Sequence, residues 1–403
     1  MFINTFLVSD GIVRRLQFMK KLPTEVYLLG AVSFFTDIAS EMVYPLLPLF
    51  LTGVLGASTV IVGLVEGIAE ATASLFKVVG GRISDRMAAR KPLILLGYGF
   101  PALLRPVLAL ATAPWQVLTY RFLDRVGKGL RTAPRDALIA EVANQDSYGR
   151  AYGFHRAMDS LGATIGPLLA FLLLPLLDFR GVFWVSAIPA LLATLVIVFF
   201  LRERRGLVRP LPPLRFSTFS LRYRWFLLVT GVATLGLSSN AFLILRLNDL
   251  GLSAAQTTLV YTAYNLLYAL MAYPLGSLAD RVGARALVML GFTTYALVYL
   301  GFGLSSAGWQ GILLFLLYAV YSAAFEGSSR AYLAQIIPTT EKASAIGLYH
   351  TLVGLLLFPA STLFGILWQD FGSSVAFFTA SALAFTALIL FWLDPTHRRG
   401  YTP

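Results

Sequence analysis

The chain has 403 residues, of which 57% are apolar and 13% charged, with a net charge of +12 and no cysteine. Apolar stretches of about 20 residues recur along it and exclude a single water-soluble globule, while the lack of cysteine excludes disulfides, thiolate metal sites and a cysteine nucleophile. The stretches have the period of helices that are buried on all sides, and not that of alternating barrel strands, so we predict an all-α polytopic membrane protein.

The segments follow in chain order. Residues 1–22 predict a cytoplasmic or interfacial helix on the inner leaflet, with a start codon assigned too far upstream as the alternative. Residues 23–203 and 225–394 predict two six-helix bundles, residues 204–224 a cytoplasmic linker rich in proline and arginine, and residues 395–403 a cytoplasmic tail. The twelve predicted transmembrane helices are 26–51, 57–80, 92–113, 115–133, 151–176, 181–202, 225–249, 253–276, 286–305, 308–329, 342–368 and 373–393.

Basic residues crowd alternate loops between these spans, with Arg180 as the clear exception. This positive-inside bias predicts an inner (cytoplasmic) membrane protein with both termini in the cytoplasm. The net charge therefore reports topology in a lipid bilayer, and we do not expect a nucleic-acid partner.

An internal repeat relates the two bundles. The loop Gly81-Arg82-Ile83-Ser84-Asp85-Arg86 returns 195 residues later as Gly276-Ser277-Leu278-Ala279-Asp280-Arg281, and the same offset sets Arg135 over Arg330. A period of half the chain indicates a duplicated bundle, because the units of a solenoid are far shorter.

Twelve spans, a half-chain repeat and the repeated Gly-x-x-x-Asp-Arg loop together resemble the major facilitator superfamily of secondary transporters. That resemblance implies six plus six helices, alternating access and a monomer. The superfamily's loop signature maps onto Gly81, Asp85 and Arg86, with the following basic pair one place late at Arg90 and Lys91, and its second copy maps onto Gly276, Asp280 and Arg281.

By this resemblance the loop is a gate. Asp85 would pair with basic groups of neighbouring spans and face a helix N-terminus of the opposite half, which would hold the cytoplasmic side shut while the cavity opens outward. The alternative is that Arg86, Arg90 and Lys91 anchor the loop to anionic headgroups.

Many ionisable residues lie at membrane depth in the first half, where each is costly unless it is paired or hydrated. They predict a polar cavity that carries substrate or protons, and the alternative is a lattice of ion pairs that fixes helix register. The residues are Asp37, Glu41, Glu66, Glu70, Lys77, Arg105, Arg121, Asp124, Arg125, Lys128, Arg131, His155, Arg156 and Asp159.

Arg121 begins a segment that is similar to the Arg-x-x-Gln-Gly-x-Gly signature of proton antiporters in this superfamily, where the arginine is linked to proton transfer. Asp124 and Arg125 depart from it. Our candidates for proton coupling are therefore Arg121 with Asp37 and Glu41, and then Glu66 and Glu70. Gly162, Gly166 and Pro167 resemble the Gly-x-x-x-Gly-Pro element of antiporters, which predicts a close helix approach and a bend.

The second half is less charged at depth. Its polar-tipped residues predict either a surface for the body of a substrate or ordinary helix packing, and His350 is a further candidate. Our candidates for substrate binding in the two halves are Arg105, Arg125, Lys128, Arg156, Asn240, Tyr261, Asn265 and His350.

These features favour a secondary transporter over an enzyme or a sensor, because the three histidines are scattered and no phosphate loop, cofactor motif or metal cluster is present. The basic stripe from Arg121 to Lys128 favours a small anionic or zwitterionic solute moved by proton-coupled efflux. The alternative is a proton antiporter of lipophilic cations, which would use the acidic residues.

Overall fold

The computed structural model describes residues 22–87, 89–143, 147–203, 220–337 and 342–394, so the predicted N-terminal segment, most of the linker and the tail lie outside the described residues. The first half contains α2 (Thr24–Val43), α3 (Leu47–Leu49), the π-helical turn η1 (Phe50–Val54), α4 (Thr59–Arg86), α5 (Lys91–Ala109), α6 (Pro114–Val142) and α7 (Tyr148–Phe199). The second half contains α8 (Leu221–Leu235), α9 (Asn240–Asp249), α10 (Ala254–Val282), α11 (Ala284–Leu304), α12 (Gly308–Ile336), α13 (Lys342–Phe371) and α14 (Ser373–Trp392).

Local signals account for several helix ends. Ser58 caps α4 by accepting a hydrogen bond from the amide of Ile61, and Ser253, which lies 195 residues later, caps α10 in the same way. α7 is two helices joined at Asp178, whose φ of 56° breaks the helix, and the Asp178 carboxylate accepts from the amides of Arg180 and Gly181 at 2.8 and 3.2 Å. This break lies between the predicted spans 151–176 and 181–202.

The described residues contain nine segments that are long and apolar enough to cross a membrane, with the two helices of α7 counted as one. α6 is not among them, although it has 29 residues, because it is rich in charged side chains. The structure therefore confirms an all-helical membrane protein, and the count of twelve spans stays a prediction. Two predicted spans, 26–51 and 225–249, are broken: the first into α2, α3 and η1, and the second into α8 and α9.

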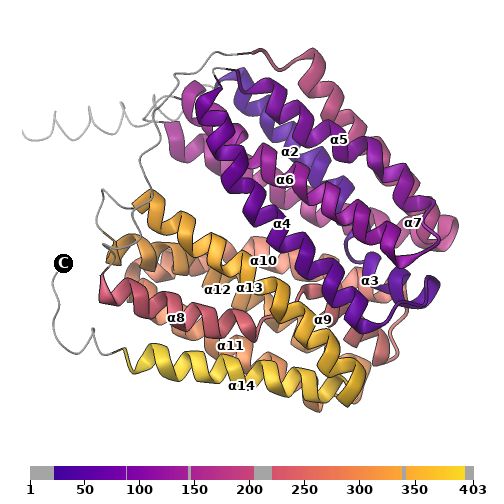
Figure 1. Ribbon diagram of the computed structural model, residues 1–403, viewed down its shortest axis with the longest axis vertical. Coiled ribbons are helices and arrows are strands. Elements are labelled where there is room, and N and C mark those ends of the chain that lie inside the picture. Colours follow the sequence, from indigo (N-terminus) through magenta and orange to yellow (C-terminus); the bar gives the residue numbers. More distant parts are fainter. Residues whose placement is uncertain (1–21, 88, 144–146, 204–219, 338–341, 395–403) are drawn as a thin grey trace, which may run out of the picture.

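The two halves are joined at one end and separate at the other. Figure 1 shows them converging beside α3 and α9, on the right of the view, and diverging toward the left. One apolar core crosses between the halves at the converging end, where Phe50 and Phe242 are fully buried. Near the other end each half has its own core, one around Tyr98 and Leu138 and one around Phe226. We call these the outer and inner ends, following the topology that the sequence predicts.

Contacts between the halves follow the internal repeat. α4 packs on α13, and α10, the repeat counterpart of α4, packs on α7, the counterpart of α13. α3 contacts α9 at the outer end.

Candidate functional site

A cavity of about 590 Å³ lies between the halves, lined by residues of α2, α4, α6, α7, α10 and α12. Six basic and four acidic side chains line it: Lys77, Lys128, Arg131, Arg135, Arg156 and Arg330, and Asp37, Asp136, Asp159 and Glu326. The formal charge of the lining is thus +2. A second hollow of about 410 Å³ adjoins the cavity in the second half and shares four lining residues with it, Asn265, Tyr268, Glu326 and Arg330.

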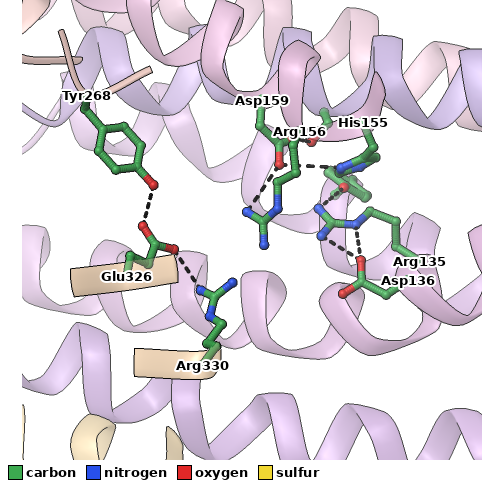
Figure 2. Close-up of polar contacts among 10 residues, drawn as sticks. Arg135, Asp136, His155, Arg156, Asp159, Tyr268, Glu326 and Arg330 are labelled. Atoms are coloured by element: carbon green, nitrogen blue, oxygen red, sulfur yellow. Dashed lines mark hydrogen bonds and ion pairs between the residues drawn. The ribbon is translucent and has the colours of Figure 1, made fainter. Parts of the chain in front are cut away.

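The carboxylate of Asp159 on α7 is the centre of one cluster in the cavity wall. Figure 2 shows this carboxylate facing His155 and Arg156, with ion-pair distances of 3.5 and 3.8 Å, and Ser33 donates a hydrogen bond to it. Next to it, Arg135 binds Asp136 at 2.8 Å.

A second cluster faces the first from the other half. Arg330 donates to Glu326 at 2.7 Å, both on α12, and the hydroxyl of Tyr268 on α10 donates to the same carboxylate (Figure 2). Three of the four cavity carboxylates are therefore engaged by neighbouring side chains.

Two cavity cations have no such partner. The ammonium groups of Lys77 and Lys128 make no hydrogen bond and no ion pair with any described residue, and both side chains are exposed to the cavity. The carboxylate of Asp37 likewise has no hydrogen bond or ion pair within the described part of the chain. The cavity thus has two free ammonium groups against one free carboxylate, in a lining whose formal charge is +2, and this balance favours an anion.

A buried polar cluster lies at the outer end. Glu66 on α4 pairs with Arg121 on α6 at 2.6 Å, with 3% and 5% of their surfaces exposed. The other oxygen of Glu66 accepts from Ser239 of the second half at 3.1 Å, and the hydroxyls of Ser239 and Tyr44 are 3.2 Å apart. Because Tyr44 and Ser239 are repeat counterparts, their contact marks the pseudo-twofold axis that relates the halves.

The symmetry-related contact uses an aromatic residue. Tyr261 is the counterpart of Glu66, and its ring centroid lies 5.6 Å from that of Tyr44. The Tyr261 hydroxyl donates to Glu41 of α2 at 2.9 Å. Two carboxylates of the first half, Glu41 and Glu66, thus hold hydroxyl groups of the second half and close the outer end.

The structure divides the predicted site residues into two groups. Asp37, Lys128, Arg156 and Asn265 line the larger cavity, and Asn240, Tyr261, Asn265 and His350 line the second hollow. The other candidates line neither the cavity nor the hollow. Glu41, Glu66 and Arg121 lie in the outer cluster, and Arg125 lies 3.8 Å from Glu70 and 3.9 Å from Asp124. Arg105 donates to the carbonyl of Ala39 and the hydroxyl of Ser40. The buried charges therefore form a polar cavity toward the inner end and a lattice of ion pairs toward the outer end, which are the two interpretations that the sequence left open.

In the predicted gating loop, the carboxylate of Asp85 is half-buried and that of Asp280 is exposed, and neither has a hydrogen bond or ion pair among the described residues. Arg86 and Arg281 are exposed, while Gly81 and Gly276 are not crowded by any other helix. Arg90 is buried and binds Glu141 of α6 at 2.5 Å and Ser84 at 2.9 Å. The expected contacts of Asp85 are not made in this conformation, in which the inner ends lie apart.

Gly162 and Gly166 lie where α7 meets α2. A Cβ atom on either glycine would come within 2.6 Å of a backbone oxygen of α2, that of Phe34 or Ile38. Pro167 follows inside α7. The two helices are in backbone contact here, as the motif predicts.

Lys77, Arg131 and Asp159 were among the ionisable residues that predicted a cavity, but they were not candidates for binding or coupling. Five other cavity residues were not selected by sequence reasoning: Arg135, Asp136, Tyr268, Glu326 and Arg330. The repeat itself pointed to two of them, because it sets Arg135 over Arg330, and an arginine at both positions suggests a shared role at the interface of the halves. Glu141, the partner of Arg90, had no such signal.

The sequence matches the family model of the Major Facilitator Superfamily over residues 29–245 and 226–403, once for each half. The chain belongs to the major facilitator superfamily. It is therefore a membrane transporter, and the prediction of a transporter instead of an enzyme is confirmed.

The similar proteins differ in how much of this chain they match, from nearly all of it to less than two thirds. The MFS-type transporter MJ1317 of Methanocaldococcus jannaschii is 33% identical over 92% of this chain and 95% of its own length. The multidrug resistance protein MdtH of Yersinia pestis is 30% identical over 62% of this chain and 64% of its own. A crystal structure of a POT family transporter in complex with 5-aminolevulinic acid shares the fold, with a TM-score of 0.79, 14% identity and coverage of 93% of this chain and 96% of that one.

Proposed function

We propose that this protein is a secondary active transporter that exports a small anionic or zwitterionic organic solute from the cytoplasm by alternating access, coupled to protons. The observation that carries the proposal is the cavity of about 590 Å³ in which Lys77 and Lys128 have no anionic partner within the described residues. An unpaired cation in a partly desolvated site gains most from a ligand that brings a negative charge.

The charge pairing in the cavity supports this choice. Asp159, Asp136 and Glu326 are each held by a guanidinium group, so their charges are largely compensated within the wall. A cationic solute would have to compete with an arginine for each of these carboxylates, whereas an anion meets the two lysines directly.

The outer cluster supports proton coupling. Glu41 and Glu66 accept hydrogen bonds from Tyr261 and Ser239 across the two halves. A protonated carboxyl group has weaker acceptor capacity and carries a donor of its own, so a proton arriving from outside would weaken these contacts and allow the outer end to open. Protons and the opening of one side are thereby linked.

A second candidate is export of lipophilic cations. Asp37 in the cavity has no partner among the described residues, and the MdtH relative bears the name of a multidrug resistance protein. That match covers less than two thirds of either chain, and it also supports export as the direction.

Flux in proteoliposomes tests the proposal. The probes are radiolabelled benzoate, glutamate and tetraphenylphosphonium, each with and without an imposed pH gradient and a protonophore. We expect gradient-driven flux of an anionic or zwitterionic probe, lost with the protonophore and reduced about tenfold in Lys128→Gln, as expected for loss of one charged contact. Flux of tetraphenylphosphonium alone, unaffected by Lys128→Gln, would overturn the proposal in favour of the second candidate.

A further inference from the structure

The second hollow has a wall of aromatic rings. Its lining includes Tyr261, Tyr264, Tyr268, Tyr318, Tyr321 and Phe325. Several of these rings are stacked: the planes of Tyr264 and Tyr318 differ by 25° at 5.7 Å, and those of Tyr321 and Phe325 by 23° at 5.7 Å. Rings in this arrangement offer faces and edges to another planar group.

The charged cavity and the aromatic hollow meet at the cluster of Tyr268, Glu326 and Arg330, which lines both (Figure 2). Asn265 lines both as well, and its amide donates to the carbonyl of Ala163 at 2.8 Å. Because the two spaces have these four residues in common, one ligand can extend from one into the other. Volumes of about 590 and 410 Å³ are each in the range that holds a drug-sized molecule.

The two free lysines line the charged cavity but not the hollow, and they lie on neighbouring helices. Gly129 of α6, the residue after Lys128, packs so closely on α4 that a Cβ there would come within 2.9 Å of the backbone nitrogen of Lys77. The side chains of Lys77 and Lys128 therefore start from the contact between these helices, and both line the same cavity. Two ammonium groups placed in this way suit a single carboxylate, sulfonate or phosphate.

We propose that the cavity and the hollow form one site for an amphipathic aromatic anion, whose acidic group lies against Lys77 and Lys128 and whose ring lies among the tyrosines of α10 and α12. This proposal rests on the proposed function and narrows its substrate class. The two ends of the site select different parts of the ligand: the lysines select charge, and the tyrosines select a planar body over a saturated one.

Three ligands separate these effects: 2-naphthoate, decalin-2-carboxylate, which has the same carbon skeleton in saturated form, and the uncharged 2-naphthamide. Equilibrium binding to the full chain in lipid nanodiscs gives a Kd for each. We expect 2-naphthoate to bind about fivefold more tightly than the decalin acid, the size of one favourable aromatic pair, and about tenfold more tightly than the amide.

Variants of the chain assign each preference to its end of the site. In Lys77→Gln and Lys128→Gln the advantage of 2-naphthoate over 2-naphthamide should fall about tenfold, and in Tyr318→Leu its advantage over the decalin acid should vanish. Lys91→Gln is the matched control, because the Lys91 ammonium lies outside the cavity and donates to the carbonyl of Val198 at 3.0 Å. Its Kd values should not change.

The outcomes that contradict the proposal differ from those that contradict the function. Equal affinity for the naphthoate and the decalin acid, or lysine variants with unchanged Kd values, would overturn the two-ended site and leave anion export standing. Failure of every anion to bind, with flux of lipophilic cations, would overturn both. Melting temperatures of the unliganded variants show whether Tyr318→Leu is folded, and the comparison of the three ligands on the unmodified chain decides the ring preference without that variant.

Discussion

The two contacts that join the halves, α4 with α13 and α10 with α7, are copies of each other, and they are packed differently. At the first, four glycines allow backbone contact: Gly63, Gly67, Gly354 and Gly365. A Cβ on Gly67 would meet the oxygen and Cα of Phe358 at 2.8 and 2.9 Å, and one on Gly365 would meet the oxygen of Thr59 at 2.5 Å. At the second, the counterparts 195 residues away are Thr258, Thr262, Asp159 and Ala170.

The consequence is visible at Asp159. Its counterpart Gly354 lies directly against Ser74 of α4, whereas Asp159 lines the charged cavity between α7 and α10. Positions that are glycine in the first pair of helices carry side chains in the second pair, and a side chain between two helices limits how closely their backbones approach. Divergence at a few positions has thus made α4 and α13 a close contact, while α7 and α10 border the site. We expect the halves to rock about the contact of α4 with α13.

The largest effect should come from Gly67→Leu. Its side chain would collide with backbone atoms of Phe358, which cannot move without the whole of α13, at a cost of about 3 kcal/mol or more. We expect a large fall in melting temperature and no transport in proteoliposomes.

The control for Gly67→Leu is its counterpart, Thr262→Leu in α10, because Thr262 is buried but already has a branched side chain where Gly67 has none. Gly276→Ala adds a methyl group to an α10 glycine with no neighbouring atom within 4 Å and should be neutral or slightly stabilising. If Thr262→Leu is as damaging as Gly67→Leu, the two interfaces are equally close in the working protein and the comparison fails.

A smaller effect should come from Tyr261→Phe, which removes the hydroxyl that binds Glu41 across the halves at 2.9 Å. A hydrogen bond to a charged group contributes about 1.5 kcal/mol to the stability of the closed outer end, because the carboxylate is hydrated again when that end opens. Without the bond, the outward-open population should rise roughly tenfold. A membrane-impermeant maleimide measures this on a cysteine introduced at Leu46, which is fully buried at the outer end of a chain without cysteines.

The matched control for this measurement is Tyr264→Phe, one turn along the same helix. Its hydroxyl lies 2.9 Å from that of Ser322, which belongs to the same half, so its loss should leave the labelling rate unchanged. Equal labelling of the two variants would show that the Tyr261 bond does not hold the outer end shut.

The repeat and the spans could be predicted from the sequence because they depend on local composition and on matches within the chain. The partner that each charged side chain meets inside the protein could not be predicted in this way. Arg105 and Lys128 both lie at membrane depth, but the guanidinium of Arg105 is taken up by the carbonyl of Ala39, 66 residues away, while Lys128 faces the cavity. The basic stripe of α6 could be seen in the sequence, but the neighbouring helices decide what each of its side chains meets: Arg121 pairs with Glu66, whereas Lys128 lines the cavity.

The candidate site shows the same limit. The pair Glu326 and Arg330 has the i, i+4 spacing of a helical ion pair and could be predicted locally, whereas the hydroxyl of Tyr268 reaches the same carboxylate from another helix. The conformation of the halves is also absent from the sequence, and it decides whether Asp85 has a partner.

The smallest effect on the conformation described here should come from Asp85→Asn, because that carboxylate has no hydrogen bond or ion pair among the described residues. We expect melting temperature and ligand affinity within about 0.5 kcal/mol of the unmodified chain, and a transport rate reduced severalfold, since the loop would act only when the inner ends close. Asp280→Asn, the same change in the second copy, should slow transport less, because Asp280 is exposed where Asp85 is half-buried. Equal losses in the two variants would mean that the loops work as a symmetric pair and that only the helix interfaces have diverged, while full transport rates in both would remove the gating role of these aspartates.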